Sequence, residues 1–369
     1  MMKLPFFNPR KTIYILPFFV VIFFLASGLH AENLIVNENT NPTELGKEEA
    51  EISQSNKSQN HNLSFNYRPL EVLKQDFAKT DNNKSLLGNN VYGFTYPESL
   101  VKGRAIGAYT GLGVYGIGSV FVYNYIWYKD MERAPFHFYD DNKDWLQMDK
   151  HGHMYSAYHQ TRMSYHLFRW IGYSKKTSLW ISSGISTFIQ FQVEFWDGLH
   201  EGYGFSYGDI IANSLGTGLF AAQEALWDEQ IFKLKFSYWP SRYREHSPEH
   251  LGDTPFKALF YDYNAHTQWI SGSLRRITGI EAIPKWLNIS VGFSGMGMLK
   301  EIDNIGISGF EDYQRYSQTF LSLDVDLSYL KPKNPFLRGL VFIANMIKFP
   351  APALEYNKVD GLKFRALYF

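Results

Sequence analysis

The sequence predicts an α+β protein in which a glycine-rich, hydrophobic bundle of about four helices precedes a small antiparallel sheet. Long apolar stretches with helical periodicity fill the region up to Trp227, whereas shorter segments with alternating apolar residues follow it. Of the 369 residues, 17% are aromatic and only 20% are charged, which indicates large apolar surfaces. A chain of this length can form one large domain or two smaller ones.

Four long segments are predicted to be helices: residues 102–128, 151–172, 177–196 and 207–227. In the first segment, Gly103, Gly107 and Gly111 repeat every four residues, so a partner helix can approach closely on that face. The third segment carries a single charge, Glu194, and its length of about 20 residues would suffice to cross a bilayer core. Short connections between the four segments predict a bundle.

Strands are predicted in the second half of the chain, at residues 232–238, 287–298, 317–329 and 361–369. In residues 320–327 the set Phe320, Ser322, Asp324 and Asp326 alternates with Leu321, Leu323, Val325 and Leu327, a period-two pattern typical of a strand with one apolar face. About four strands are therefore expected in a region, residues 231–369, that packs on the bundle of residues 92–230.

The first 91 residues are predicted to lie outside this folded part. Residues 1–31 have the features of a signal peptide, because the basic Lys3, Arg10 and Lys11 precede an apolar run that ends near the small-residue site at Ala31. An uncleaved anchor is the alternative. Residues 32–91 are mostly polar and are expected to form a disordered tether.

Charge and cysteine content exclude several functions. The formal net charge is zero, so a nucleic-acid partner is not expected. Aromatic side chains favour membrane–water interfaces, which makes membrane lipid the expected partner. There is no cysteine, so disulfides, thiolate metal sites and a cysteine-linked lipid anchor are all excluded.

Three polar signals interrupt the apolar helices. They are D-K-x-x-H at Asp149, Lys150 and His153; E-x-x-D at Glu194 and Asp197; and S-x-x-D-x-x-x-N at Ser206, Asp209 and Asn213. Within each signal the side chains lie about one turn apart, on one helix face. In a bundle the candidate catalytic residues would surround one interior point: His153, Glu194, Asp197 and Asp209. The supporting residues would be Asp149, Lys150, Ser206 and Asn213. An imidazole among carboxylates suits acid–base chemistry or a divalent metal ion, with the metal's identity left open.

Each signal also has a purely structural interpretation. Asp149 stands where the second helix needs an N-cap, and Ser206 with Asp209 forms a capping box. His153 would then be a hydrogen-bonded core histidine. A carboxylate in the apolar surroundings of Glu194 is costly unless it is paired, and its expected partner is His153 or Lys150. Such a pair would serve either function or helix register.

These signals and three later blocks resemble the YfiM-like family of periplasmic proteins, which contain the domain of unknown function 2279. The later blocks are residues 262–271 (DYNAHTQWIS), 284–293 (PKWLNISVGF) and 348–355 (KFPAPALE). The three signals are also similar to those of VanZ-like membrane proteins. Neither resemblance implies an established activity. The YfiM resemblance implies a periplasmic location, and many members are lipoproteins, from which this cysteine-free chain departs.

The expected function is that of an exported, membrane-associated, periplasm-facing protein of the cell envelope whose buried His/carboxylate site handles a lipid or cell-wall precursor. One alternative is a non-catalytic structural or assembly component that binds other envelope proteins. The second alternative is an envelope hydrolase with a metal or acid–base site. The inner and outer membranes are both compatible with the sequence.

Overall fold

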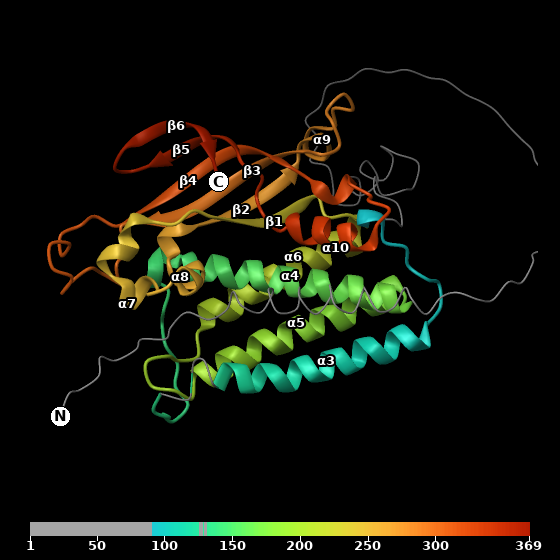
Figure 1. Ribbon diagram of the computed structural model, residues 1–369, viewed down its shortest axis with the longest axis horizontal. Coiled ribbons are helices and arrows are strands. Elements are labelled where there is room, and N and C mark those ends of the chain that lie inside the picture. Colours follow the sequence, from blue (N-terminus) through green and yellow to red (C-terminus); the bar gives the residue numbers. More distant parts are fainter. Residues whose placement is uncertain (1–90, 125–127, 129–130) are drawn as a thin grey trace, which may run out of the picture.

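The computed structural model describes residues 91–124, 128 and 131–369 and shows two layers, a sheet above and helices below (Figure 1). The predicted signal peptide at 1–31 and, apart from Val91, the predicted tether at 32–91 lie outside these residues. Helices come first in the chain and strands follow, so the predicted α+β class is confirmed.

The helical layer contains four long helices. They are α3 (Lys102–Tyr123), α4 (Met148–Ile171), α5 (Lys175–Asp197) and α6 (Tyr207–Trp227). The bounds of α6 agree with the prediction, and those of α4 and α5 differ by three residues or fewer. Helix α4 lies between the sheet and helices α5 and α3 (Figure 1).

A buried polar stripe holds α5 against α4 and α6. The side chains at every fourth position of α5 are buried and polar: Ser178, Ser182, Ser186, Gln190 and Glu194. Ser186 Oγ lies 3.0 Å from the carbonyl oxygen of Ala157 on α4 and 3.1 Å from Thr217 Oγ1 on α6. Since serine side chains are short, the three helix backbones pack closely around this stripe.

The predicted glycine-rich hydrophobic bundle is not confirmed in its details. A Cβ atom on Gly103 or Gly107 of α3 would meet no described atom within 4 Å, so these glycines do not serve a close helix contact. One close approach occurs instead on α6, where a Cβ atom on Gly216 would lie 2.1 Å from the Met154 carbonyl oxygen of α4. Among the described residues, no helix is long and apolar enough to cross a membrane, and the expectation for residues 177–196 was wrong.

The sheet is a six-stranded antiparallel meander in the order β1 to β6. Its strands are β1 (Phe232–Tyr238), β2 (His266–Ser273), β3 (Leu287–Met296), β4 (Tyr316–Val325), β5 (Ala351–Asn357) and β6 (Gly361–Tyr368). The sequence predicted four of them and missed β2 and β5. The predicted strand at 317–329 ends earlier, because Leu327–Tyr329 forms a 3-10 turn, η7.

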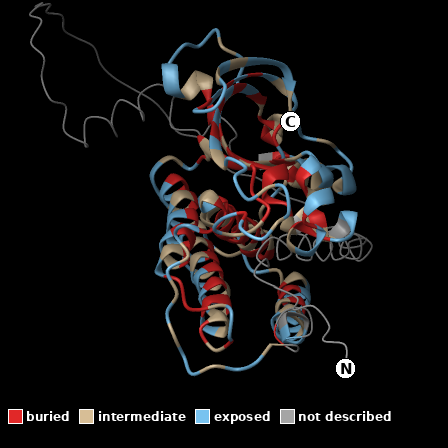
Figure 2. Cartoon of the chain, turned by 90° about the vertical axis from the view of Figure 1, so that its left-hand side faces the viewer, coloured by how far each residue is buried: buried red, intermediate tan, exposed pale blue. Residues whose placement is uncertain are grey.

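The sheet curls so that its polar face is enclosed. Buried Lys235 Nζ lies 2.8 Å from Asp324 Oδ2, and the Ser271 hydroxyl donates to the same oxygen at 2.6 Å. Tyr368 at the end of β6 reaches back to β2, where its hydroxyl is 3.0 Å from Thr267 Oγ1. Figure 2 shows the resulting curvature, with buried residues on the inner side of the sheet.

Short elements close the ends of the two layers. They are η2 (Val91–Gly93), η4 (Asp144–Gln147), η5 (Arg242–His246), α7 (Pro248–Leu251), α8 (Pro255–Tyr261), η6 (Tyr263–Ala265), α9 (Leu274–Thr278) and α10 (Pro335–Ala344). Helix α10 packs its buried Phe342 against Tyr92 of η2 and Met163 of α4, which joins the two layers at one end.

Candidate functional site

The ends of three helices meet at one buried polar cluster. The first turns of α4 and α6 and the last turn of α5 contribute to it, and α4 supplies His153 as the central residue. His153 is 1% exposed, so every polar atom near it interacts in a low-dielectric setting. The three sequence signals therefore converge as predicted, although Asp197 stands apart.

The two nitrogens of His153 face different partners. Nδ1 lies 3.2 Å from Asn213 Oδ1 and 3.5 Å from Glu194 Oε1. Nε2 lies 3.3 Å from Asp209 Oδ1 and 3.8 Å from Asp149 Oδ2. Because the amide oxygen of Asn213 can only accept, the proton of the neutral ring is assigned to Nδ1. The lone pair on Nε2 then faces the two aspartates.

Lys150 binds the aspartates from the outer side of the cluster. Its ammonium lies 2.6 Å from Asp141 Oδ2, 2.7 Å from Asp209 Oδ1 and 3.3 Å from Asp149 Oδ2. Burial alone would lower the pKa of Lys150, but the three carboxylates outweigh it and raise the pKa above its usual range. Lys150 is therefore charged at every physiological pH.

Local backbone features place Lys150 and the start of α4. Gly208 on α6 leaves room for the lysine, since a Cβ atom there would lie 2.8 Å from Lys150 Cε. Just before α4, Trp145, Leu146 and Gln147 all have positive φ, which is costly for residues with side chains. Trp145 is held there by burial and by stacking on Tyr263, with ring centroids 5.1 Å apart.

Burial favours the neutral forms of His153 and Glu194. It raises the pKa of Glu194 well above its usual range, with further contributions from Asp209 and Asp197. It lowers the pKa of His153 to about 4, because the charged imidazolium is poorly solvated and the nearby aspartates offset this only in part. At neutral pH the cluster thus holds a neutral imidazole beside a protonated or easily protonated carboxyl group.

The side chains of Asp141 and Asp209 are hydrogen-bonded to each other, which shifts their pKa values in opposite directions. Burial raises the pKa of Asp209 well above its usual range, and its hydrogen bond with Asp141 acts in the same direction. The pKa of Asp141 is lowered despite burial, since Asp209, Lys150 and Ser206 all stabilise its charged form. A carboxyl group with a raised pKa, that of Asp209, therefore lies 3.3 Å from His153 Nε2.

Asp197 is not in contact with His153. Its carboxylate accepts a hydrogen bond from the Tyr128 hydroxyl at 2.9 Å. Burial raises the pKa of Asp197 to about 7, and the bond from Tyr128 opposes this shift. Of the four candidate catalytic residues, the structure brings His153, Glu194 and Asp209 together.

The structural interpretations hold for some residues. Ser206 is the N-cap of α6, where its hydroxyl accepts from the Asp209 N–H at 3.1 Å, and it also donates to Asp141 Oδ1 at 2.6 Å. Asp149 is not an N-cap, since α4 begins at Met148. Its carboxylate instead accepts a hydrogen bond from the Tyr263 hydroxyl at 2.9 Å.

Several buried polar atoms at the centre form no hydrogen bond with any described residue. They are Glu194 Oε1, Asn213 Nδ2 and both amide atoms of Gln190, which lies one turn before Glu194. Such atoms cost about 1–3 kcal/mol each when they stay unsatisfied. The cluster therefore offers donors and acceptors to a small polar group or to water.

The same residues have the donor set of a metal site. One ligand atom each from Asp149, His153 and Asp209 lie within 4.8 Å of one another, and imidazole with carboxylates suits a divalent cation. The Lys150 ammonium already neutralises two of these carboxylates, so an ion would have to displace it.

An aromatic cluster covers this end of the helices. Its rings contact one another with centroids 5.0–6.5 Å apart and belong to Phe136, Phe138, Phe191, Phe195, Phe205 and Tyr207. Phe195 follows Glu194 directly, and Tyr207 follows Ser206. Tyr207 is 62% exposed and Phe138 is 56% exposed, so an apolar surface adjoins the polar cluster.

The sequence prediction missed three members of this arrangement. Asp141 lies in the segment before η4, where nothing local indicates a site. Tyr128 follows the end of α3. Tyr263 was within the block at 262–271 that carries the family resemblance, which was the only signal for it.

The comparisons with known proteins give one match. A family model described as "Predicted periplasmic lipoprotein (DUF2279)" matches residues 137–224. The resemblance seen in the sequence is thereby confirmed over these residues, which include α4 to α6, Asp141 and the candidate residues. The description supports an exported, envelope-associated location. The likeness to VanZ-like proteins is not shown. No curated protein matches the chain. No solved structure matches it either.

Proposed function

We propose that this protein lies on a membrane of the cell envelope and presents its His153 cluster, as an acid–base site, to the polar head of a lipid or of a lipid-linked cell-wall precursor. The observation that carries the proposal is the position of the cluster. A buried imidazole, next to two carboxyl groups of raised pKa, lies directly beside an exposed aromatic surface.

Membrane contact is supported by the inverted polarity of α5 and α6. Their buried faces are polar, whereas their exposed faces carry large apolar side chains, the reverse of a helix on a water-facing surface. We call these exposed residues the outer helical surface: Trp180, Phe188, Phe191, Phe195, Tyr207, Ile211, Leu215 and Leu226. Apolar patches of this kind mark lipid or protein contacts.

Acid–base chemistry is supported by the protonation states of the cluster. His153 Nε2 offers a lone pair as a base, and 3.3 Å from it lies Asp209, whose pKa burial raises well above the usual range. Pairs of titratable groups whose surroundings push their pKa values apart are typical of acid–base sites. The unpaired atoms of Glu194 and Asn213 would orient the bound polar group.

A metal-dependent hydrolase is the second candidate, because Asp149, His153 and Asp209 have suitable spacing. It requires Lys150 to leave its position. A structural or assembly role is the third candidate. The three ion pairs of Lys150 favour it, since they link α4, α6 and the Asp141 segment and would fix helix register without any chemistry.

The test is to identify the lipids that remain bound to the protein after purification in mild detergent. We expect mass spectrometry to find a lipid with a polar head group on the wild-type protein. In His153→Gln its amount should fall by about tenfold, the effect of losing one or two hydrogen bonds. His151→Gln is the matched control, because His151 lies two residues away and stacks on Phe293 outside the cluster.

Equal lipid content in the two variants, or none in the wild type, would refute lipid handling at this site. Metal analysis of the same samples separates the candidates. A divalent ion bound at one per chain and lost in His153→Gln would favour the hydrolase. A stable partner protein with neither lipid nor metal would favour the assembly role.

A further inference from the structure

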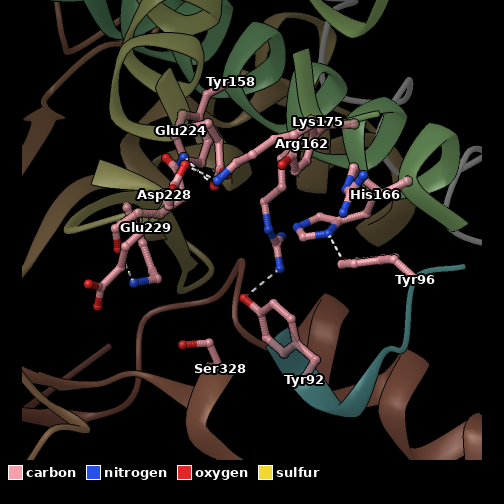
Figure 3. Close-up of a pocket in the computed structure, with 14 residues that line it drawn as sticks. Tyr92, Tyr96, Tyr158, Arg162, His166, Lys175, Glu224, Asp228, Glu229 and Ser328 are labelled. Atoms are coloured by element: carbon pink, nitrogen blue, oxygen red, sulfur yellow. Dashed lines mark hydrogen bonds and ion pairs between the residues drawn. The ribbon is translucent and has the colours of Figure 1, made fainter. Parts of the chain in front are cut away.

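A second polar cavity lies at the other end of α4, on the turns that follow the His153 cluster. Its walls come from α4, the start of α5, the end of α6, η2, β1 and η7 (Figure 3). Arg162 is nine residues beyond His153, or about 14 Å along the helix axis. The two sites therefore share α4 but no side chain.

Arg162 is a buried cation in this cavity, and no described carboxylate pairs with it. It is 4% exposed, and its Nη2 donates to the Tyr92 hydroxyl and to the Phe342 carbonyl oxygen, both at 2.8 Å. Its guanidinium also stacks on the Phe342 ring, 3.8 Å from the centroid. These partners are neutral, so they offset only a small part of the free energy that it costs to remove the positive charge from water.

The neighbouring turns of α4 extend this cationic wall. Arg169 lies two turns further along, and it too has no ion pair with a described carboxylate. Its Nη1 donates to the Tyr173 carbonyl oxygen at 2.7 Å, and its guanidinium lies over the Tyr96 ring. His166 stands between the two arginines and interacts with the Tyr96 hydroxyl at 2.5 Å (Figure 3). Burial and both arginines lower its pKa well below the usual range, so it is neutral.

The acidic residues of the opposite wall are already engaged. Glu224 accepts a hydrogen bond from Gln230 Nε2 at 3.0 Å, Asp228 pairs with Lys175, and Glu229 Oε2 lies 3.2 Å from Arg276. Lys233, the remaining cation of the wall, pairs with Asp326 at 2.7 Å. Glu224 is bound by a neutral amide, so two arginines face one carboxyl group without an ion pair, and the described lining keeps an excess of positive charge at Arg162 and Arg169.

We propose that this cavity binds a small organic anion, whose carboxylate or phosphate group is held by Arg162 and Arg169. Guanidinium groups bind both kinds of oxyanion through charge-assisted hydrogen bonds. The hydroxyl groups of the lining tyrosines would contact the body of the ligand. The ligand would replace the missing counter-charge of Arg162.

Calorimetric titration of the full chain with inorganic phosphate and, separately, with acetate tests this site at constant ionic strength. We expect the wild type to bind at least one of the two ions at millimolar concentration, which identifies the oxyanion. Arg169→Gln should weaken binding by about tenfold, the effect of one lost charge-assisted bond. Arg162→Gln should abolish it, and Arg162→Lys should restore it only in part because lysine lacks the planar fork.

Lys176→Gln is the matched control, since Lys176 is an exposed cation of α5 outside the cavity. It should bind like the wild type, as should Glu194→Gln, whose site is the separate His153 cluster. Arg162→Gln could lose binding through misfolding. The result for Arg169→Gln therefore decides whether the cavity binds the anion, because the Arg169 side chain is less buried. Failure of the wild type to bind either ion below about 10 mM, or equal affinity in Arg169→Gln and Lys176→Gln, overturns the proposal.

Discussion

At the scale of single residues, the His153 cluster is governed by the cost of burying charge. Glu194 and Asp209 hold protons that exposed carboxyl groups would lose, and His153 rejects the proton that an exposed imidazole would take up at mildly acidic pH. Lys150 is the exception, because three carboxylates stabilise its ammonium. Stability must therefore depend on pH in a way that single substitutions can reveal.

Glu194→Gln should gain stability relative to the wild type as pH rises. The folded state raises the pKa of Glu194, so its stabilising contribution is complete below the unfolded pKa and is lost as pH rises through the folded value. Glutamine resembles the protonated acid and does not titrate. The difference in free energy of unfolding should shift in favour of the variant as pH rises above the unfolded pKa of about 4.3. Chemical denaturation at several pH values measures it, and Glu245→Gln at an exposed site should show a constant difference.

Lys150→Gln should convert the cluster into a metal site. The ammonium now lies within 3.3 Å of both Asp149 and Asp209, and its removal leaves two carboxylates and the His153 lone pair facing one point. A divalent cation would replace the lost charge. We expect calorimetry to detect zinc binding by the variant and none at the same concentration by the wild type. Binding by neither protein would show that the donor geometry is unsuitable.

The cluster residues expected from the sequence lie on α4, α5 and α6 or directly before them, and those it missed lie outside these long helices. Helical spacing predicts that Asp149 and His153 lie on one helix face. Burying the carboxylate of Glu194 is costly, which predicts that this side chain has a polar partner. Asp141 reaches the cluster from a loop, and Tyr263 reaches it from the one-turn 3-10 helix η6. Their positions depend on long-range packing, such as that of Trp145 on Tyr263, which no local pattern encodes.

At the scale of secondary-structure elements, the packing of α6 on α4 depends on one glycine. Gly216 faces the carbonyl group of Met154, and nothing larger than hydrogen fits between the two backbones. Gly218, two residues later, faces open space and would admit a side chain. The same helix therefore contains both a required glycine and a dispensable one.

Gly216→Ala should destabilise the protein by about 3 kcal/mol or more, because the helices must separate to admit a methyl group. Separation would also shift Asn213 and Asp209 away from His153, which lie on the same two helices. Gly218→Ala should be neutral or should stabilise by about 0.5–1 kcal/mol, the gain in helix propensity. Denaturant unfolding of both variants measures the effects. Similar values for the two would mean that α4 and α6 are not in close contact at Gly216.

The elements themselves were predictable to different degrees. The long helices were found because their apolar periodicity is continuous over many turns. Strand β2 was missed because both of its faces are buried and its residues, HTQWISGS, are mostly polar, so they show no alternation. Strand β5 begins with Ala351 and Pro352, and its buried face carries Glu355 and Asn357, so its polar side chains point inward.

At the scale of the whole molecule, both layers enclose polar residues and expose apolar ones. The outer face of the sheet repeats the pattern of the helices. Exposed apolar side chains lie in register across strands β3 to β6, at Val291, Leu321, Leu354 and Phe364. The enclosed face carries ion pairs such as Lys235 with Asp324. Hydrophobic burial would be more complete if the apolar surfaces contacted lipid.

Charges placed on the outer helical surface should therefore weaken membrane binding and leave the fold intact. Phe188 is 67% exposed and Leu215 is 58% exposed, so neither contributes much to the core. The double variant Phe188→Glu, Leu215→Glu loses two large apolar groups and brings two charges close to the lipid. The fraction of protein that floats with phospholipid vesicles should therefore fall by about tenfold or more, as expected from the free energy of transferring these side chains to lipid. Ile305→Glu, at a loop position 67% exposed, is the control and should float like the wild type. Undiminished flotation of the double variant would assign membrane binding to another surface.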